Sequence, residues 1–196
     1  MEIILATHNK NKVKEMQNFL SGTFENLTVI TATEAGFTED IEENGTTFEE
    51  NALIKARAVR KDGAISIADD SGLCVNALDG RPGIFSARYA GEPCDDKKNN
   101  AKLLAELKPF EDRSAYFVSA IACVLPNGEE FTVRGIANGV MLESEIGDGG
   151  FGYDPLFYFP PLKKTFAQLS REEKNGVSHR GNALRALRDE LIKRLK

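Results

Sequence analysis

The sequence is poor in the side chains that bind soft and borderline metal ions. It contains three cysteines and two histidines. The cysteines (Cys74, Cys94 and Cys123) are odd in number, lie far apart and form no C-x-x-C pair, so neither a disulfide framework nor a zinc site is indicated. Two histidines supply almost no ligands for an imidazole-bound zinc or iron centre. Any catalytic metal should therefore be a hard ion held by oxygen atoms, which means magnesium or manganese.

The sequence also lacks a basic excess and a long apolar run. Its formal net charge is −5 and its pI is near 5.2, so no surface for duplex nucleic acid is indicated, although a local cationic pocket can still bind a small anion. No apolar run approaches the length of a membrane-spanning helix. The N-terminal stretch MEIILATHNK has no positive region followed by a cleavable apolar segment. We expect a cytoplasmic protein whose partners include neither a nucleic-acid polymer nor a membrane.

The length of 196 residues suits one α/β domain and is short for two independent ones, so we predict a single domain over residues 1–196. Apolar periodicity and turn residues predict the elements. The expected strands are 2–6, 27–31, 64–68, a short one near 73–78, 114–125 and 129–142, and the expected helices are 10–20, 47–62, 95–108 and 179–195. Helices alternate with strands early, and Asn127-Gly128 is a strong hairpin signal later. These features predict a mixed sheet with helices on both faces.

The stretch THNKNK (7–12) lies where the first expected strand leads into a helix. A helix start offers unpaired N–H groups and the positive end of a dipole, so Thr7, His8 and Asn9, with Lys10 and Lys12, would suit a phosphate. An ordinary capped helix with solvated lysines explains the same pattern. The G-x-x-x-x-G-K-[ST] arrangement of a P-loop is absent.

Two adjacent carboxylates, Asp69 and Asp70, follow the apolar stretch AISIA (64–68). We expect a strand that ends there in a turn, and a carboxylate at a strand end can bind magnesium or hold a water molecule for attack. A divalent cation would also relieve the repulsion between the two groups. The alternative is an ordinary turn in which one aspartate caps backbone amides and the other faces water.

Further carboxylates precede the second expected helix. Glu42, Glu43 and Glu50 each offer oxygen atoms that would complete a site for a hard cation. The run EDIEENG (39–45) is also typical of a solvated loop. Thr46 or Thr47 is expected to cap this helix.

The stretch GDGGFGYD (147–154) formally matches the dinucleotide fingerprint G-x-G-x-x-G. We reject that interpretation, because Asp154-Pro155 interrupts the helix that should follow. Glycines around Phe151 and Tyr153 favour a loop whose backbone approaches a flat ligand while an aromatic ring stacks on it. The alternative is a glycine turn with its aromatic side chains in the core.

The stretch REEKNGVSHRGNAL (171–184) opens the last expected helix. Ser178 is a plausible N-cap, which places His179 and Arg180 in the first turn and Lys174 in the loop before it. Cations at a helix N-terminus are unfavourable with respect to the helix dipole, so their presence there indicates an anion or an electron-rich acceptor nearby. Exposed charges without a ligand are the alternative.

Five stretches, in order and with family-like spacing, carry a resemblance to a known family. They are LATHNKNKVKEM, FEENALIKARA, ADDSGLCVNALDGRPGIFSARYAG, GGFGYDPLF and REEKNGVSHRGNAL. Together they resemble the inosine-triphosphate pyrophosphatase family, which hydrolyses non-standard purine nucleoside triphosphates. The resemblance implies a homodimer of an elongated, two-lobed α/β/α fold around a long central mixed sheet, with the nucleotide in the cleft between the lobes. It also implies Mg²⁺ as cofactor, with Mn²⁺ as a substitute.

The resemblance also assigns roles to residues. It implies that Asp70 is the proton acceptor and a metal ligand, that Lys12 and Lys55 are active-site lysines, and that Glu42 or Glu43 is the second metal ligand, with a slight preference for Glu42. The implied substrate-binding residues are Thr7, His8, Asn9, Lys10, Asn11, Lys12, Ser71, Phe151, Gly152, Tyr153, Asp154, Lys174, His179 and Arg180. His8 stands where many relatives have glycine.

The expected reaction is hydrolysis of the α–β phosphate bond of inosine, deoxyinosine or xanthosine triphosphate (ITP, dITP or XTP) to the monophosphate and pyrophosphate, which cleanses the nucleotide pool. Asp70 would deprotonate the attacking water, and Lys12 would hold the phosphates in line. Donors from His179 or Arg180 would favour bases that carry an oxygen at C6, and Phe151 would stack on the purine.

Overall fold

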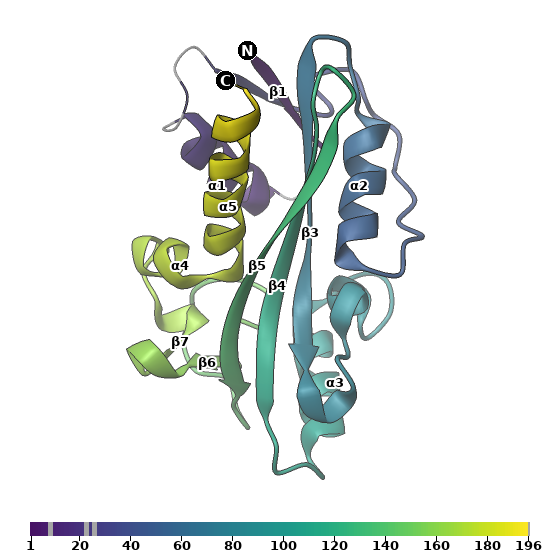
Figure 1. Ribbon diagram of the computed structural model, residues 1–196. Coiled ribbons are helices and arrows are strands. Elements are labelled where there is room, and N and C mark those ends of the chain that lie inside the picture. The colour runs from purple at the N-terminus through teal and green to yellow at the C-terminus, as the bar shows by residue number, and fades with distance from the viewer. Residues whose placement is uncertain (8–9, 22–23, 25–26, 196) are drawn as a thin grey trace. The chain divides into compact units, whose positions relative to one another are not determined.

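In a computed structural model, the chain forms a seven-stranded mixed sheet flanked by helices (Figure 1). The structure describes residues 1–7, 10–21, 24 and 27–195, without the side chains of residues 10–12, 15 and 21. The strands are β1 (Glu2–Leu5), β2 (Thr28–Thr31), β3 (Ala64–Val75), β4 (Ser114–Val124), β5 (Glu130–Met141), β6 (Phe157–Phe159) and β7 (Lys164–Thr165). The helices are α1 (Lys10–Ser21), α2 (Phe48–Ala58), α3 (Asp96–Leu107), α4 (Arg171–Val177) and α5 (His179–Arg194), and 3-10 helices cover Asn76–Leu78, Gly83–Arg88, Pro160–Leu162 and Phe166–Gln168.

The order of strands in the sheet is β2-β1-β3-β4-β5-β6-β7. β1 pairs parallel with β2 and β3, whereas β6 pairs antiparallel with β5 and β7. The predicted α/β class and mixed sheet are therefore confirmed. Gly128 turns the chain between β4 and β5 with a φ of +86°, a conformation that glycine adopts readily, as the Asn127-Gly128 signal predicted.

Two compact units divide the chain. Unit 1 comprises Met1–Asp70, Ser119–Arg134 and Ala183–Lys196, and unit 2 comprises Ser71–Val118 and Gly135–Asn182. β3, β4, β5 and α5 each contribute residues to both units.

In unit 1, the side chains of the strands alternate between two apolar clusters. Ile3 and Leu5 of β1 pack with α1 and α5, whereas Ile4 packs with α2. Period-two alternation is the pattern of a strand buried on both faces. The predicted apolar sides of the helices are buried and consist of Met16 and Leu20 on α1, Phe48, Ala52 and Ala56 on α2, and Leu184, Leu187 and Leu191 on α5.

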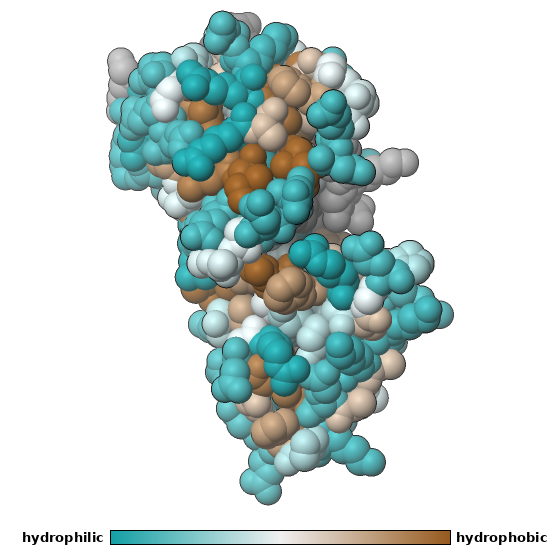
Figure 2. Space-filling model, turned by 90° about the vertical axis from the view of Figure 1, so that its right-hand side faces the viewer, coloured by the Kyte–Doolittle hydropathy of each residue, from teal (hydrophilic) through white to brown (hydrophobic). Residues whose placement is uncertain are grey.

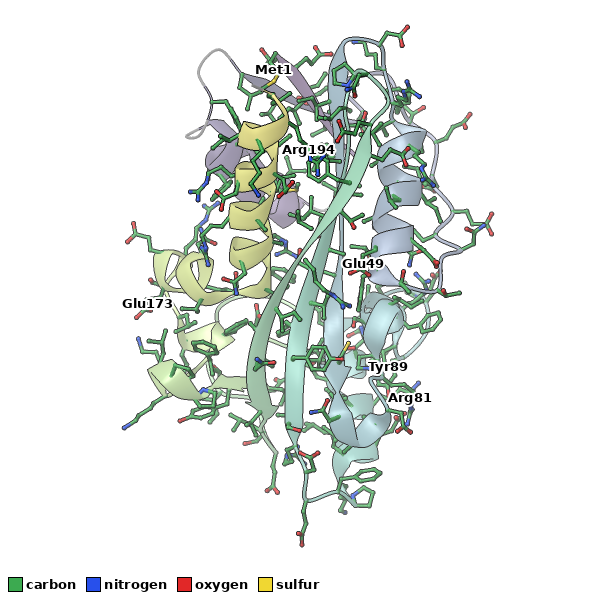
Figure 3. The ribbon with its side chains drawn as sticks, in the orientation of Figure 1. Met1, Glu49, Arg81, Tyr89, Glu173 and Arg194 are labelled. Carbon is green, nitrogen blue, oxygen red and sulfur yellow. The ribbon has the colours of Figure 1, made fainter. Side chains whose placement is uncertain are left out.

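The expected end of one helix is wrong, because α2 stops at Ala58 instead of continuing to residue 62. α5 ends at Arg194, one residue before the expected end, and Leu195 is 39% exposed. Near the end of α5, the Arg194 guanidinium pairs with Glu129 and lies 4.6 Å from the centre of the Phe131 ring (Figure 3). These contacts hold the end of the helix to the hairpin between β4 and β5.

In unit 2, α3 packs against an apolar cluster that contains several aromatic rings. Leu103 and Leu107 of α3 are fully buried there. The rings of Phe117 and Phe157 lie 4.6 Å apart in a tilted arrangement, and those of Phe157 and Phe166 lie 4.7 Å apart. Such contacts add about 0.5–1.5 kcal/mol per pair to the free energy gained from burial.

The expected turn at Asp69 and Asp70 is wrong. β3 runs without interruption from Ala64 to Val75 and so includes both aspartates. The strand stays extended at the two aspartates because it neighbours β4 there, where Ser119 donates to Asp69, whereas β1 pairs only with Ala64–Ile67.

The surface is mainly hydrophilic in the view of Figure 2, with apolar side chains in small patches between charged ones. Such scattered apolar residues are ordinary on protein surfaces. None of the helices in the described ranges has the length and apolar character needed to cross a bilayer.

Candidate active site

Asp69 and Asp70 are both buried, with exposed fractions of 1% and 8%. Because side chains alternate along a strand, Asp69 follows Ile67 toward the cluster of α1 and α5, and Asp70 follows Ala68 toward α2. The two carboxylates therefore lie on opposite faces of the sheet. This geometry limits their mutual repulsion without any bound cation.

Asp69 is bound within the sheet. Its Oδ1 accepts a short hydrogen bond from the hydroxyl of Ser119 on β4. A buried carboxylate needs such a donor, because desolvation without one costs several kcal/mol. The expectation that one aspartate of the pair faces water is therefore wrong for Asp69.

Asp70 belongs to a group of polar side chains that we call the Asp70 cluster, made up of Glu43, Asn51, Lys55 and Asp70. The Lys55 Nζ atom lies 3.3 Å from Asp70 Oδ1 and 3.1 Å from Glu43 Oε2. Asn51 Nδ2 lies 3.4 Å from Asp70 Oδ2. Asn51 and Lys55 are four residues apart on α2, so they share a face of the helix. One ammonium group thus contacts two carboxylates, in side chains that are 11% exposed for Lys55 and Asp70 and 31% for Glu43.

Asn51 connects Asp70 to the loop that carries Glu43. Its Oδ1 accepts a hydrogen bond from the backbone N–H of Gly45 at 2.8 Å. A Cβ atom at position 45 would lie 2.6 Å from this oxygen, so the contact requires glycine. Our reading of the sequence missed Asn51. The sequence did contain a signal, because Asn51 is a polar residue on the apolar side of α2, one turn before Lys55.

The three glutamates near α2 have different surroundings. Glu43 contacts Lys55, whereas the side chain of Glu42 is exposed. Glu50 accepts hydrogen bonds from the backbone N–H and the hydroxyl of Thr46, which lower the pKa of its carboxyl. Glu50 thus serves the helix start, where Thr47 is the N-cap. In the described part of the chain, no group of three or more histidine, cysteine or acidic side chains is placed to hold a metal ion.

The predicted phosphate-binding stretch is only partly described. Thr7 follows β1, where its backbone N–H donates to Leu5 O at 3.0 Å. His8 and Asn9 lie outside the described residues. Residues 10–12, which are Lys10, Asn11 and Lys12, begin α1 as predicted, and their side chains are outside the description.

A second group of side chains, in unit 2, surrounds Phe151. We call it the Phe151 cluster, made up of Phe151, Asp154, Lys174, Arg180 and Ser71. The Lys174 Nζ atom lies 2.5 Å from Asp154 Oδ2 and 4.8 Å from the centre of the Phe151 ring, and the Arg180 guanidinium lies 5.9 Å from the same ring. Both distances suit cation–π contact. Burial raises the pKa of the Asp154 carboxyl, and the Lys174 ammonium opposes that shift.

Lys174 lies on α4 and not in a loop as predicted. Ser170 caps this helix and exchanges hydrogen bonds with Glu173 in a capping box. The sequence contains the start signal of α4 as S-x-x-E at residues 170–173. The prediction used only Ser178 as an N-cap and therefore missed this helix.

The glycines of the 147–154 loop allow the chain to pack closely against itself. A Cβ atom at Gly150 would lie 2.1 Å from Asp154 Oδ2, and one at Gly149 would lie 2.7 Å from Ala167 O. Gly152 has a φ of +61°. The close approach that the sequence suggested for a ligand is therefore made at Gly149 and Gly150 by the protein itself.

The two aromatic residues of this loop differ in burial. Tyr153 is buried in the core of unit 2, where its hydroxyl donates to Ser86 O at 2.8 Å, and burial raises its pKa. Phe151 is only partly buried. The core alternative thus holds for Tyr153, and Phe151 retains a surface that a ligand can contact.

His179 and Arg180 begin α5, and Ser178 caps it as predicted by accepting from Gly181 N at 3.1 Å. Both cationic side chains are buried, so the alternative of exposed charges is wrong. The His179 ring stacks on Phe117 at 4.7 Å, and Arg180 Nη2 donates to Ser71 Oγ at 3.1 Å.

The fold is of the α/β class, with the polar Asp70 cluster in unit 1 and the Phe151 cluster in unit 2. The profile of the Ham1 family matches residues 3–190. The chain therefore belongs to the Ham1 family, which confirms the resemblance carried by the five sequence stretches.

Individual relatives match over nearly the whole chain. A protein of Desulforamulus reducens named dITP/XTP pyrophosphatase is 51% identical over 189 residues, covering 94% of this chain and 92% of that protein. A protein of the same name from Clostridium perfringens is 48% identical over 199 residues and covers 97% of each chain. The structure of the Staphylococcus aureus Ham1 protein has a TM-score of 0.91 and 44% identity, covering 99% of this chain and 100% of that one.

Proposed function

We propose that this protein hydrolyses the α–β phosphate bond of inosine, deoxyinosine or xanthosine triphosphate and releases the nucleoside monophosphate and pyrophosphate. Membership of the Ham1 family and the names of the relatives support this activity. The observation that carries it is the buried carboxylate of Asp70, held beside Lys55 and Asn51. We assign the triphosphate to the Asp70 cluster and the α1 start, and the base to the Phe151 cluster.

In the proposed mechanism, Asp70 accepts the proton of the attacking water. Asn51 and Lys55 orient its carboxylate, because both donate to it from one face of α2. Lys55, together with Lys12 at the start of α1, would hold phosphate oxygens in line. Phosphoryl transfer needs chiefly this positioning and charge stabilisation from a protein.

Magnesium is part of the same proposal. Asp70 and Glu43 would hold the ion. The Lys55 ammonium lies within 3.3 Å of both carboxylates, and this supports the idea that the two groups can share one cation. Their oxygen atoms are the donors that Mg²⁺ prefers, and two protein carboxylates plus substrate oxygens are a usual ligand set. When bound, the ion supplies neutralisation of the charge on the phosphates.

Substitution of Lys55 tests whether the ammonium competes for that position. Lys55→Gln should tighten Mn²⁺ binding to the nucleotide-free protein by roughly tenfold, because two carboxylates lose a neighbouring positive charge. Titration followed by electron paramagnetic resonance measures this affinity. Lys61→Gln, which removes a lysine paired with Glu2 on the surface, is the matched control and should leave the affinity unchanged. Equal affinities of the Lys55→Gln and wild-type proteins would contradict the assignment.

The Phe151 cluster supports a preference for purines with an oxygen at C6. Arg180 and His179 can donate hydrogen bonds, and adenine presents an amino group at C6 where hypoxanthine and xanthine present an acceptor. A donor left unpaired by adenine costs about 1–3 kcal/mol. Stacking on Phe151 would add affinity for any purine.

A nucleotide panel tests the activity itself. With Mg²⁺, the purified protein should release pyrophosphate from ITP, dITP and XTP at least about thirtyfold faster, as kcat/KM, than from ATP, because two unpaired donors cost about 2 kcal/mol or more. A chelator should abolish release, and added Mg²⁺ or Mn²⁺ should restore it. Orthophosphate as the product would indicate a stepwise phosphatase instead, and binding without turnover would indicate a sensor.

The homodimer that the resemblance implies and the cytoplasmic location expected from the sequence also belong to this proposal. Light scattering during size-exclusion chromatography tests the dimer, which should give twice the 21.5 kDa mass of the chain.

A further inference from the structure

Helix α3 holds both backbone groups of Gly152, although none of its residues belongs to the motifs assigned to substrate. The Gly152 N–H donates to Asp96 Oδ2 at 2.8 Å, and the Gly152 carbonyl accepts from Asn100 Nδ2 at 3.2 Å. Asp96 and Asn100 are four residues apart, so they lie on one face of α3. Gly152 has no side chain, so α3 can bind this residue only through its backbone N–H and carbonyl groups.

α3 is itself firmly attached within unit 2. Leu103 and Leu107 are fully buried in the core, and Lys102 Nζ donates to Tyr89 O at 2.7 Å. Glu106 accepts from the Tyr89 hydroxyl and from Arg81, which lie beside α3 in Figure 3. The helix thus provides a rigid support for the contacts to Gly152.

The residue fixed by this arrangement is Phe151. Its own N–H donates to Asp154 Oδ2 at 2.8 Å, and the next peptide group in the chain is the one that Asp96 holds. With the peptide groups on both sides fixed, the direction in which the Phe151 side chain leaves the backbone is fixed as well. The ring then lies beside the cations of Lys174 and Arg180.

Packing alone does not explain an asparagine at position 100, because burying its polar amide costs free energy. Its amide group donates to Glu145 at 2.6 Å as well as to Gly152, while its Oδ1 is buried without a hydrogen bond in the described part of the chain. A leucine of similar size would avoid the cost of that oxygen. The side-chain amide of Asn100 therefore connects α3 to the Glu145 side chain and to the backbone of Gly152.

We propose that Asp96 and Asn100 are positioning residues that hold Phe151 in place for stacking on the purine base. The inference rests on the proposed function, because it takes Phe151 as the base-stacking residue. Asp96 and Asn100 act through the backbone of Gly152 and touch no substrate atom. They influence binding of the base and leave the chemical step at Asp70 unaffected.

Asp96→Ala and Asn100→Leu test this role kinetically. Each should raise KM for ITP by roughly five- to tenfold with kcat within about twofold, because the loop must then be ordered by the substrate on binding. In a Phe151→Ala background, the same substitutions should change KM by less than about twofold, since residues that act through one another are not additive. An unchanged KM in the wild-type background, or an equal rise in both backgrounds, would overturn the proposal.

Asp95→Ala is the matched control. Asp95 caps α3 by accepting from Lys98 N at 3.1 Å, whereas Gly152 is bound by Asp96 and Asn100, so loss of the Asp95 side chain weakens the helix start without releasing the loop. The control should lower the melting temperature and leave KM within about twofold of the wild-type value. A KM rise equal to that of Asp96→Ala would show that general weakening of α3 is the cause.

Hydrogen–deuterium exchange separates this inference from the proposed function. Amides of the 147–154 loop should exchange faster in Asp96→Ala and Asn100→Leu than in Asp95→Ala, whatever the substrate proves to be. Unchanged exchange would refute the support of the loop by α3. Faster exchange in a protein that hydrolyses no purine triphosphate would instead retain the support and reject the proposed function.

Discussion

Asp70→Asn is expected to lower kcat for ITP hydrolysis by about 10³-fold, because an amide can neither accept the proton of the attacking water nor supply a full negative charge to Mg²⁺. The substitution keeps the size of the side chain, so the sheet stays intact and Lys55 then contacts a neutral amide instead of a carboxylate. Binding of ITP, measured by isothermal titration calorimetry, should change little. Full activity of this variant would show that another group accepts the proton.

Asp69→Asn is the control for this experiment, since it alters a neighbouring carboxylate on the opposite face of the sheet. Weakening the contact with Ser119 should lower the free energy of unfolding by about 1–3 kcal/mol. The fall in kcat should stay within about tenfold, well short of the loss at Asp70. If both variants lost activity equally at a temperature where both are folded, the distinct roles assigned to the two aspartates would be wrong.

Glu43→Gln is expected to reduce kcat/KM by about a hundredfold, because the proposed magnesium site loses one of its two protein carboxylates. Part of this loss should be recovered at high Mg²⁺ concentration, which a titration of activity against Mg²⁺ measures. The structure supports Glu43 by its contact with Lys55.

Glu42→Gln serves as the matched variant, because it removes the same charge one residue away from an exposed position. Its activity and its Mg²⁺ requirement should stay within about twofold of the wild type, as is usual for a screened surface charge. The reverse result, a large loss at Glu42 and none at Glu43, would restore the slight preference for Glu42 that the family resemblance implied.

Much of the fold could be predicted because local patterns and tertiary structure agree. The buried faces of α1, α2 and α5 follow the helical period, and Asn127-Gly128 marks the hairpin. The turn expected at Asp69 is wrong because D-D-S-G is good turn composition, whereas the partner that keeps this part of β3 extended lies on β4. Ser119 is 50 residues from Asp69, and no local pattern predicts that contact.

The candidate site could be predicted only in part for the same reason. The motifs indicated Asp70, Phe151 and Arg180, and the resemblance added Lys55; these side-chain types suit the proposed chemistry. The motifs did not identify Asn51 or Asp96, because the role of each depends on contacts with the backbone of a distant loop. Residues that support a site in this way belong to no recognisable motif, so the sequence does not distinguish them from other polar residues.

The alternation along β3 also restricts how this segment can change during evolution. One residue added or removed between Ala64 and Asp70 would turn every later side chain to the other side of the sheet and exchange the environments of the two aspartates. Changes in length there can preserve the position of the Asp70 carboxylate only if residues are added or removed in pairs. The segment is therefore expected to keep a constant length even where its apolar residues are substituted for one another.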